Sequence, residues 1–395
     1  MPAMNATFTT PPRPFDVTAL FPQLAPLART ATRLHPQTGA PSERDSSIGG
    51  PLLWPADEAW PHCEGPHELD GVNPALSPPD LRLRRRIRAA AQGRDLTPQE
   101  RKILSRIEPP RNYPRPRPSR QPYDGSMAML PLAQLYVCDV PDLRAPAGAD
   151  LLQVLWCPFD HPPMQFMPRT LLFWRSAATV SDILAAPPEP PVVQFDGYLP
   201  EPCLLAPEQI TEYPNPLELS KEVRAQIGDW SKWQAAGDAV DSRYASYPEE
   251  FYTGNLSVAP GWKAGGWAAW GYTDPRPQSC PACDTPMVPL LTIPTFEWDA
   301  SSRSWIPEVD RQEREPISPS SNHTSPKGQA VIDILRARGF EVHDRGRVPR
   351  DVRVAPPGTD PVPRQPTAIQ IASGHKQQLY VCPTSPEHPH TELMQ

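Results

Sequence analysis

No stretch of about 18 consecutive apolar residues occurs in this chain of 395 residues, so the sequence predicts no membrane span. The first 20 residues are polar and rich in proline, and they lack the apolar core of a secretory signal. Neither a Walker loop nor a dinucleotide-binding glycine pattern is present. We therefore expect a cytoplasmic protein without a recognisable nucleotide site.

The chain also lacks an excess of positive charge, because its formal net charge is −7. This balance disfavours nucleic-acid binding over the whole surface, although a local basic patch is still possible. The seven cysteines are an odd number, and cytoplasmic cysteines stay reduced. They are therefore expected to be metal ligands, catalytic groups or inert core residues rather than a disulfide set.

Proline is abundant, with 59 residues, and 11 Trp, 10 Tyr and 10 Phe provide large apolar side chains. Proline breaks helix interiors and also restrains the residue before it, so helix content should be low. The aromatic residues are sufficient to build a real core. The composition predicts a folded body with many stiff connections.

An internal repeat is the strongest signal in the sequence. The pattern Gly-Gly-x-x-x-Trp occurs at residues 49–54 and again at 265–270, and a cysteine follows each copy, Cys63 and Cys280. A segment reading Met-aliphatic-Pro-Leu comes next in both, starting at Met129 and Met287. Both copies then end in a Cys-Pro pair with a His-Pro pair just beyond. Three matches in the same order predict two related units.

The spacing locates an insertion in the first copy. From the cysteine to the methionine there are 66 residues in the first copy and 7 in the second, so the first carries about 59 extra residues (66 minus 7). We expect a surface excursion whose two ends, near Cys63 and Met129, lie close together. Surface insertions cost little closure entropy, and deletion of 68–124 is expected to leave a folded protein.

These features predict an α+β fold made of two pseudo-symmetric β-rich units with mostly antiparallel sheets and few helices. Helices are expected at 217–227 and 327–338, the second with Ser325 as N-cap and Gly339 as its end. The predicted organisation is a proline-rich segment 1–44, a first unit 45–175 with an insert at about 66–126, a connection 176–259 and a second unit 260–395. Strands are expected at 132–138, 151–157, 171–175, 192–195, 290–296, 368–372 and 379–382.

The insert has a charge opposite to that of the rest of the chain. Residues 80–120 hold 13 basic and four acidic residues, and Thr97-Pro98-Gln99-Glu100 is a capping box. A helical hairpin is predicted, packed on the acidic body or in contact with RNA, DNA or an acidic partner. The arginines available for nucleic acid are Arg82, Arg84, Arg85, Arg86 and Arg88.

The chain resembles the YwqG-like family of bacterial and eukaryotic proteins of unknown function. The resemblance is carried by residues 46–50 (Ser-Ser-Ile-Gly-Gly), Trp54-Pro55, the strand around Gln134, residues 263–266 (Lys-Ala-Gly-Gly) and the Cys-x-x-Cys at 280–283. It covers about 45–300 and implies the fold and the compartment, but no chemistry. Ser47 departs from the family, which often has Lys there, and the insert replaces the second cysteine of the first knuckle.

Cys280 and Cys283 form half of a zinc knuckle, since two thiolates three positions apart can reach one tetrahedral ion. The repeat suggests Cys382 and His388 as the other ligands, with His390 as an alternate. Inert thiols or redox use of the pair are the competing interpretations. Corresponding positions in the first unit predict a second site from Cys63, His67, Cys157 and His161, with His62 as an alternate to His67. Cys138 and Cys203 lie on apolar runs and are expected to be inert core residues.

The functional hypothesis is a non-enzymatic scaffold stabilised by structural zinc, which binds a protein or peptide between its two halves. Four Cys/His ligands would fill the coordination shell, whereas a catalytic zinc needs an open position. A metal-dependent hydrolase and a nucleic-acid-associated protein remain as alternatives. Tryptophans 54, 60, 262, 267 and 270 line either a groove between the halves or the core.

Overall fold

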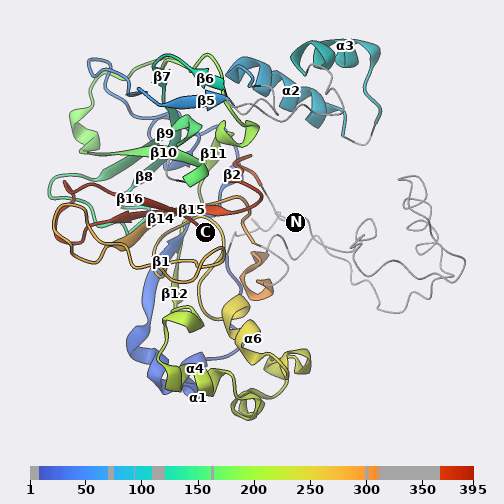
Figure 1. The fold of residues 1–395 in the computed structure, drawn as a ribbon, viewed down its shortest axis with the longest axis vertical. Helices are drawn as coiled ribbons and strands as arrows, with labels where there is room; N and C mark the ends of the chain where they lie inside the picture. The colour runs from blue at the N-terminus through green and yellow to red at the C-terminus, as the bar shows by residue number, and fades with distance from the viewer. Residues whose placement is uncertain are drawn as a thin grey trace, which may run out of the picture.

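Two six-stranded antiparallel sheets form the centre of the molecule in this computed structural model (Figure 1). The structure describes residues 9–69, 75–92, 94–108, 121–161, 164–298, 302–308, 310 and 365–395. The predicted α+β class rich in antiparallel sheet is confirmed. The helix expected at 327–338 lies outside the described residues.

The first sheet contains the long strands between residues 130 and 175 together with three two-residue strands. Its order is β10-β9-β8-β3-β11-β2, and every neighbouring pair is antiparallel. The long central strand β9 is buried along almost its whole length. The strands are β10 (Met164–Arg175), β9 (Leu151–His161), β8 (Leu130–Tyr136), β3 (Ser47–Ile48), β11 (Cys203–Leu204) and β2 (Gln37–Thr38).

The second sheet contains the strands of the C-terminal part of the chain. Its order is β12-β1-β13-β14-β15-β16, again with every pair antiparallel. The strands are β12 (Glu208–Glu212), β1 (Arg29–Arg33), β13 (Lys263–Gly265), β14 (Val288–Pro294), β15 (Lys376–Val381) and β16 (Thr391–Met394).

Strands β3, β8 and β9 of the first sheet pair at the same repeat positions as strands β13, β14 and β15 of the second. Ser47 pairs with Gln134 in the first sheet, and Lys263 pairs with Thr292 in the second. Both second strands carry a register shift directly after their proline, Pro131 or Pro289. The shared Pro-Leu segment explains this, because proline donates no ladder hydrogen bond and therefore accompanies a local irregularity.

One side-chain hydrogen bond is also repeated. The amide of Gln153 in β9 donates to the carbonyl oxygen of Leu53 at 2.9 Å, and the amide of Gln378 in β15 donates to that of Ala269 at 2.6 Å. Each acceptor lies three residues after the second glycine of its Gly-Gly pair. These local correspondences agree with two related units, but their origin by duplication stays a prediction.

In each sheet, one strand comes from the segment that precedes the other unit in the chain. Strand β1 comes before β3 in the chain, yet it lies in the other sheet, between β12 and β13. Strand β11 comes before β13 and lies between β3 and β2. Segments 1–44 and 176–259 therefore contribute strands to both sheets, and neither sheet is complete without them.

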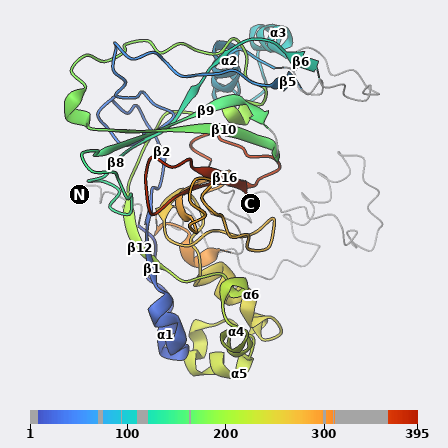
Figure 2. The same cartoon turned by 60° about the vertical axis from the view of Figure 1, so that its left-hand side comes forward.

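One hydrophobic core joins the two sheets. It contains Leu132, Val154 and Trp156 of the first sheet together with Leu291 and Leu379 of the second. In Figures 1 and 2, β14–β16 lie directly beside β8–β10, and at their edges Gln377 donates to the carbonyl oxygen of Pro168 at 2.8 Å. Side chains of both sheets meet in this core, and the predicted binding of a partner between the halves stays a prediction. Trp54, Trp60 and Trp262 are buried, whereas Trp267 and Trp270 are half-buried.

The two ends of the insert lie close together, as the sequence predicted. Strand β4 (His62–Cys63) pairs with β7 (Met127–Ala128), and β5 (His67–Leu69) pairs with β6 (Gln121–Tyr123). Two helices follow β5, α2 (Pro78–Ala90) and α3 (Pro98–Ile107), the second with the expected capping box at Thr97. We call residues 75–123 the arm. It is not only a surface excursion, because Leu76, Leu81 and Ile107 belong to the main core.

A second cluster of helices lies at the opposite end of the molecule from the arm (Figure 2). Its core is built around the buried Trp233, whose ring packs on Phe21 at 5.0 Å and on Phe251 at 5.6 Å between ring centroids. The helix predicted at 217–227 is shorter than expected and begins after Ser220, its N-cap. The helices are α1 (Val17–Leu20), α4 (Lys221–Ile227), α5 (Trp230–Trp233) and α6 (Pro248–Asn255).

Two predicted strands are not formed. At 192–195 there is only a single bridge between Val193 and Leu76. At 368–372 the backbone turns, because Ala368 and Ala372 both have positive φ, 52° and 45°. Apolar composition alone predicted these strands, but the isolated apolar residues Ile369 and Ile371 are buried from a turn instead.

Gly266 is a position where only glycine fits. Its φ is +71°, and a Cβ there would lie 2.7 Å from Cβ of Ala31 and would clash with the Glu212 carboxylate. We expect Gly266→Ala to lower the free energy of unfolding by at least about 2 kcal/mol, from strain and overpacking together. Urea denaturation checks this against Gly148→Ala, which also has positive φ but has open space around it. The control should cost only about 1 kcal/mol; equal losses would contradict the packing argument.

Candidate metal centres

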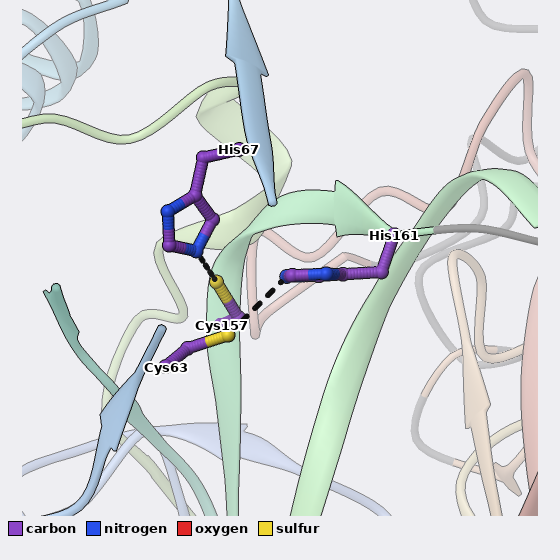
Figure 3. A group of neighbouring side chains, drawn as sticks. All are labelled: Cys63, His67, Cys157 and His161. Atoms are coloured by element: carbon purple, nitrogen blue, oxygen red, sulfur yellow. Dashed lines mark hydrogen bonds between the residues drawn. The ribbon is translucent and has the colours of Figure 1, made fainter. Parts of the chain in front are cut away.

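Four side chains from the first unit converge at the base of the arm (Figure 3). Cys63 comes from β4, His67 from β5, Cys157 from within β9 and His161 from the end of β9. Sγ of Cys63 lies 3.5 Å from Nε2 of His161, and Sγ of Cys157 lies 3.4 Å from Nε2 of His67. All four side chains are buried, and their ligand atoms lie within 4.8 Å of one another.

The local chain explains how these residues meet. Gly65, with φ +94°, turns the chain between β4 and β5 so that Cys63 and His67 face the same point. Cys157 and His161 have an even spacing on β9 and therefore point to one face of that strand. The ring of His67 packs on Phe159 at 4.9 Å between centroids, which shields the cluster from solvent.

A second cluster lies at the corresponding place in the second unit. Cys280 and Cys283 occupy a tight turn before β14, in which the N–H groups of Cys283 and Asp284 donate to the Cys280 carbonyl oxygen. Cys382 follows the end of β15, and His388 precedes β16. Nδ1 of His388 lies 3.4 Å from Sγ of Cys280, and the Sγ atoms of Cys283 and Cys382 are 3.6 Å apart. Cys280 and Cys382 are buried, whereas Cys283 is exposed.

Every thiol in the two clusters faces a backbone N–H group of the residue two positions further on. Hydrogen bonds of this kind stabilise the negatively charged thiolate, which is the form that binds a metal. The Cys280 and Cys382 thiols each face one further N–H group, from Cys283 and Ser385. The pairs of thiol and N–H are Cys63 with Gly65, Cys157 with Phe159, Cys280 with Ala282, Cys283 with Thr285 and Cys382 with Thr384.

The thiols influence one another strongly in the first cluster. A hydrogen bond from the Cys157 thiol, together with His161 and the Gly65 N–H, lowers the pKa of Cys63. Burial raises the pKa of Cys157, as does the neighbouring Cys63. A bound cation would stabilise both thiolates at this buried position.

In the second cluster the thiols differ, because burial raises the pKa of Cys280 whereas the pKa values of Cys283 and Cys382 are lowered. Burial opposes ionisation of Cys382, but the N–H groups of Ser385 and Thr384, with His388 and Cys283, lower the pKa of Cys382 to about 6. The hydrogen bond with Cys382 raises the pKa of His388. The hydroxyl group of Thr285 lowers the pKa of Cys283.

The separations fit a tetrahedral ion. Bonds of about 2.3 Å to sulfur and about 2.0–2.1 Å to nitrogen give tetrahedron edges of roughly 3.4–3.8 Å. The four closest ligand–ligand contacts described above, 3.4–3.6 Å, lie in that range. Both clusters can therefore hold a metal ion, the first through two thiols and two imidazoles and the second through three thiols and one imidazole.

All eight residues predicted as ligands lie in the two clusters, and the alternates do not. The His62 ring bonds to the carbonyl oxygen of Trp60, and His390 lies beside Thr170. Cys203 is buried as expected, but the prediction of a core position for Cys138 is wrong, because its strand β8 ends at Tyr136 and leaves it exposed. Sequence reasoning also missed the N–H groups around the sulfur atoms, since they depend on turn geometry.

Four of the five arginines of α2 pair with carboxylates. Arg85 lies 2.7 Å from Glu201, Arg88 lies 2.7 Å from Glu108, and Arg82 pairs with Glu189. Arg84 pairs with Glu108 and Asp196, and Arg86 is exposed. This is the packing on the acidic body that the sequence allowed, and it reduces the charge available to a phosphate backbone.

Comparison with known proteins found no family model that matches the chain and no curated protein that it resembles significantly. The similarity to the YwqG-like family therefore stays a prediction from the sequence. Among the described residues, no helix has the length and apolar character needed to cross a membrane.

Proposed function

We propose that this protein is a scaffold stabilised by two structural zinc ions. The observation that carries the proposal is that each unit brings four Cys/His donors together at the end of its third strand, β9 or β15. Mixed sulfur and nitrogen donors with tetrahedral spacing are those of structural zinc. Cys63, His67, Cys157 and His161 would hold one ion, and Cys280, Cys283, Cys382 and His388 the other.

A structural role is favoured over hydrolysis because four protein ligands fill the shell of zinc. A hydrolytic zinc keeps one position for water and has a general base beside it. In the first cluster all four donors are buried, which also limits the access of a substrate. The metal-dependent hydrolase is therefore the weaker alternative.

Each ion would hold a segment with little secondary structure of its own against the sheet of its unit. In the first unit it would join the base of the arm, β4 and β5, to β9. In the second it would join the turn at 280–283 to the chain after β15. The scaffold would present an outer surface to a protein or peptide partner, because the facing surfaces of the sheets are occupied by the core.

We expect the purified full-length chain to contain two zinc ions, and Cys280→Ser to contain one. Serine at 280 removes a buried thiolate of the second cluster and leaves the first intact. Elemental analysis gives the count, and X-ray absorption spectroscopy should report two sulfur and two nitrogen ligands in the variant. The control is Cys138→Ser, an exposed cysteine outside both clusters, which should keep two ions. A chain without zinc would overturn the proposal.

A further inference from the structure

The two clusters differ in how far solvent can reach their sulfur atoms. In the first, Cys63 and Cys157 are both buried in one hydrophobic cluster with Phe159, whose ring contacts those of His67 and Tyr123. In the second, Cys283 is exposed although its three partners are not. A small solute can therefore contact a ligand sulfur of the second site without any opening of the fold.

The exposed sulfur also has a neighbour with which it can react. Sγ of Cys283 lies 3.6 Å from Sγ of Cys382, and a disulfide needs about 2.0 Å between sulfur atoms. Cys283 lies on a turn and Cys382 just after the end of β15, so neither is held within a strand. In the first cluster, by contrast, Cys157 lies inside β9.

We infer that Cys283 is a site of oxidation by hydroperoxides, and that its oxidation to a disulfide with Cys382 releases the metal of the second site alone. This inference rests on the proposed function, because it needs zinc in both sites. The thiol of Cys283 donates to the Thr285 hydroxyl oxygen at 3.3 Å, and a bound zinc ion would hold this sulfur as the thiolate that attacks a peroxide.

The reaction balances with hydrogen peroxide as the oxidant. The Cys283 thiolate attacks one peroxide oxygen, the O–O bond breaks, and hydroxide leaves, which gives a sulfenic acid. The Cys382 thiolate then attacks that sulfur, a second hydroxide leaves, and the S–S bond forms. Each sulfur loses one electron, the peroxide gains two, and two protons convert the hydroxides to water. Two of the four ligands are lost, so the ion dissociates.

The experiment treats the zinc-loaded full-length chain with hydrogen peroxide in the presence of a chromophoric zinc chelator. The expected result is loss of one of the two zinc ions, with a Cys283–Cys382 linkage in peptides mapped by mass spectrometry without reduction. A thiol reductant and added zinc should restore the lost ion. The matched control is Cys138→Ser, which removes the other exposed cysteine and should leave the release unchanged.

The outcomes separate this inference from the proposed function. If the loaded chain keeps both ions, loses both at the same rate, or loses the ion of the first site first, the inference is overturned while the scaffold proposal stands. If release occurs without a Cys283–Cys382 linkage, the assignment of the modified pair is overturned. If the purified chain binds no zinc, both proposals fail.

Discussion

Replacing Cys157 with serine should remove the metal of the first site and lower the free energy of unfolding by about 4 kcal/mol or more. Zinc binds the folded state and not the unfolded one, so free zinc at about 1,000 times its dissociation constant contributes about 4 kcal/mol of stability. Structural zinc sites have such low dissociation constants that a small concentration of free zinc meets this condition. Cys157 is fully buried in β9, and its loss leaves His67 without its sulfur partner.

Zinc content and urea denaturation measured on the same preparation check this expectation. The control is Cys203→Ser, another buried cysteine on a strand of the same sheet but outside both clusters. It should keep two zinc ions and lose only the stability that a buried hydroxyl group costs, about 1–3 kcal/mol. If Cys157→Ser keeps its metal, or is no less stable than Cys203→Ser, the first site does not stabilise the fold.

The metal clusters were predictable because their signal is local and repeated. Cys280 and Cys283 lie three positions apart, and the Cys-Pro pair at 382–383 matches the one at 157–158. Once the repeat is recognised, each unit has one cysteine before its second strand (β8 or β14) and another near the end of its third (β9 or β15). Because these two strands are antiparallel neighbours, both cysteines lie at the same end of the sheet. Spacing left both His67 and His62 as candidates, because the choice between them depends on the turn at Gly65.

The exchange of β1 and β11 between the sheets was not predictable from the sequence. Arg29–Arg33 reads Arg-Thr-Ala-Thr-Arg, and no feature of this short segment indicates which sheet it joins. Its position is determined by long-range pairing with Glu208–Glu212 and Lys263–Gly265. Pairing over about 180 residues or more cannot be derived from periodicity, which reports only the local environment of a strand.

The packing of the arm was missed for a related reason. Its charge indicated a solvated helical hairpin, and the arginines do pair with carboxylates. However, Leu76, Leu81 and Ile107 reach the main core, and apolar positions on a short amphipathic helix do not reveal what covers them. Deletion of 68–124 would remove these core residues together with the part of β5 that follows His67, so it is a poorer test of modularity than the sequence suggested.

Lys263→Met should lower the free energy of unfolding by about 3–5 kcal/mol, because it breaks a fully buried ion pair and leaves the partner charge in place. Nζ of Lys263 lies 2.6 and 2.7 Å from the two carboxylate oxygens of Glu212, and both side chains are 0% exposed. Burial lowers the pKa of Lys263, and the attraction of Glu212 opposes this effect. In the variant, Glu212 would keep only the N–H groups of Ala259 and Trp267.

A double variant distinguishes the loss of charge pairing from the loss of packing. Lys263→Met with Glu212→Gln removes the unpaired charge and keeps an acceptor oxygen for the backbone N–H groups, so it should recover part of the stability lost by Lys263→Met alone. Lys221→Met, at an exposed lysine, should stay within about 0.5 kcal/mol of the parent in the same urea titration. If Lys263→Met costs no more than Lys221→Met, the pair does not hold β13 against β12 and β1. If the double variant is less stable than Lys263→Met, the cost comes from lost contacts of Glu212 rather than from its buried charge.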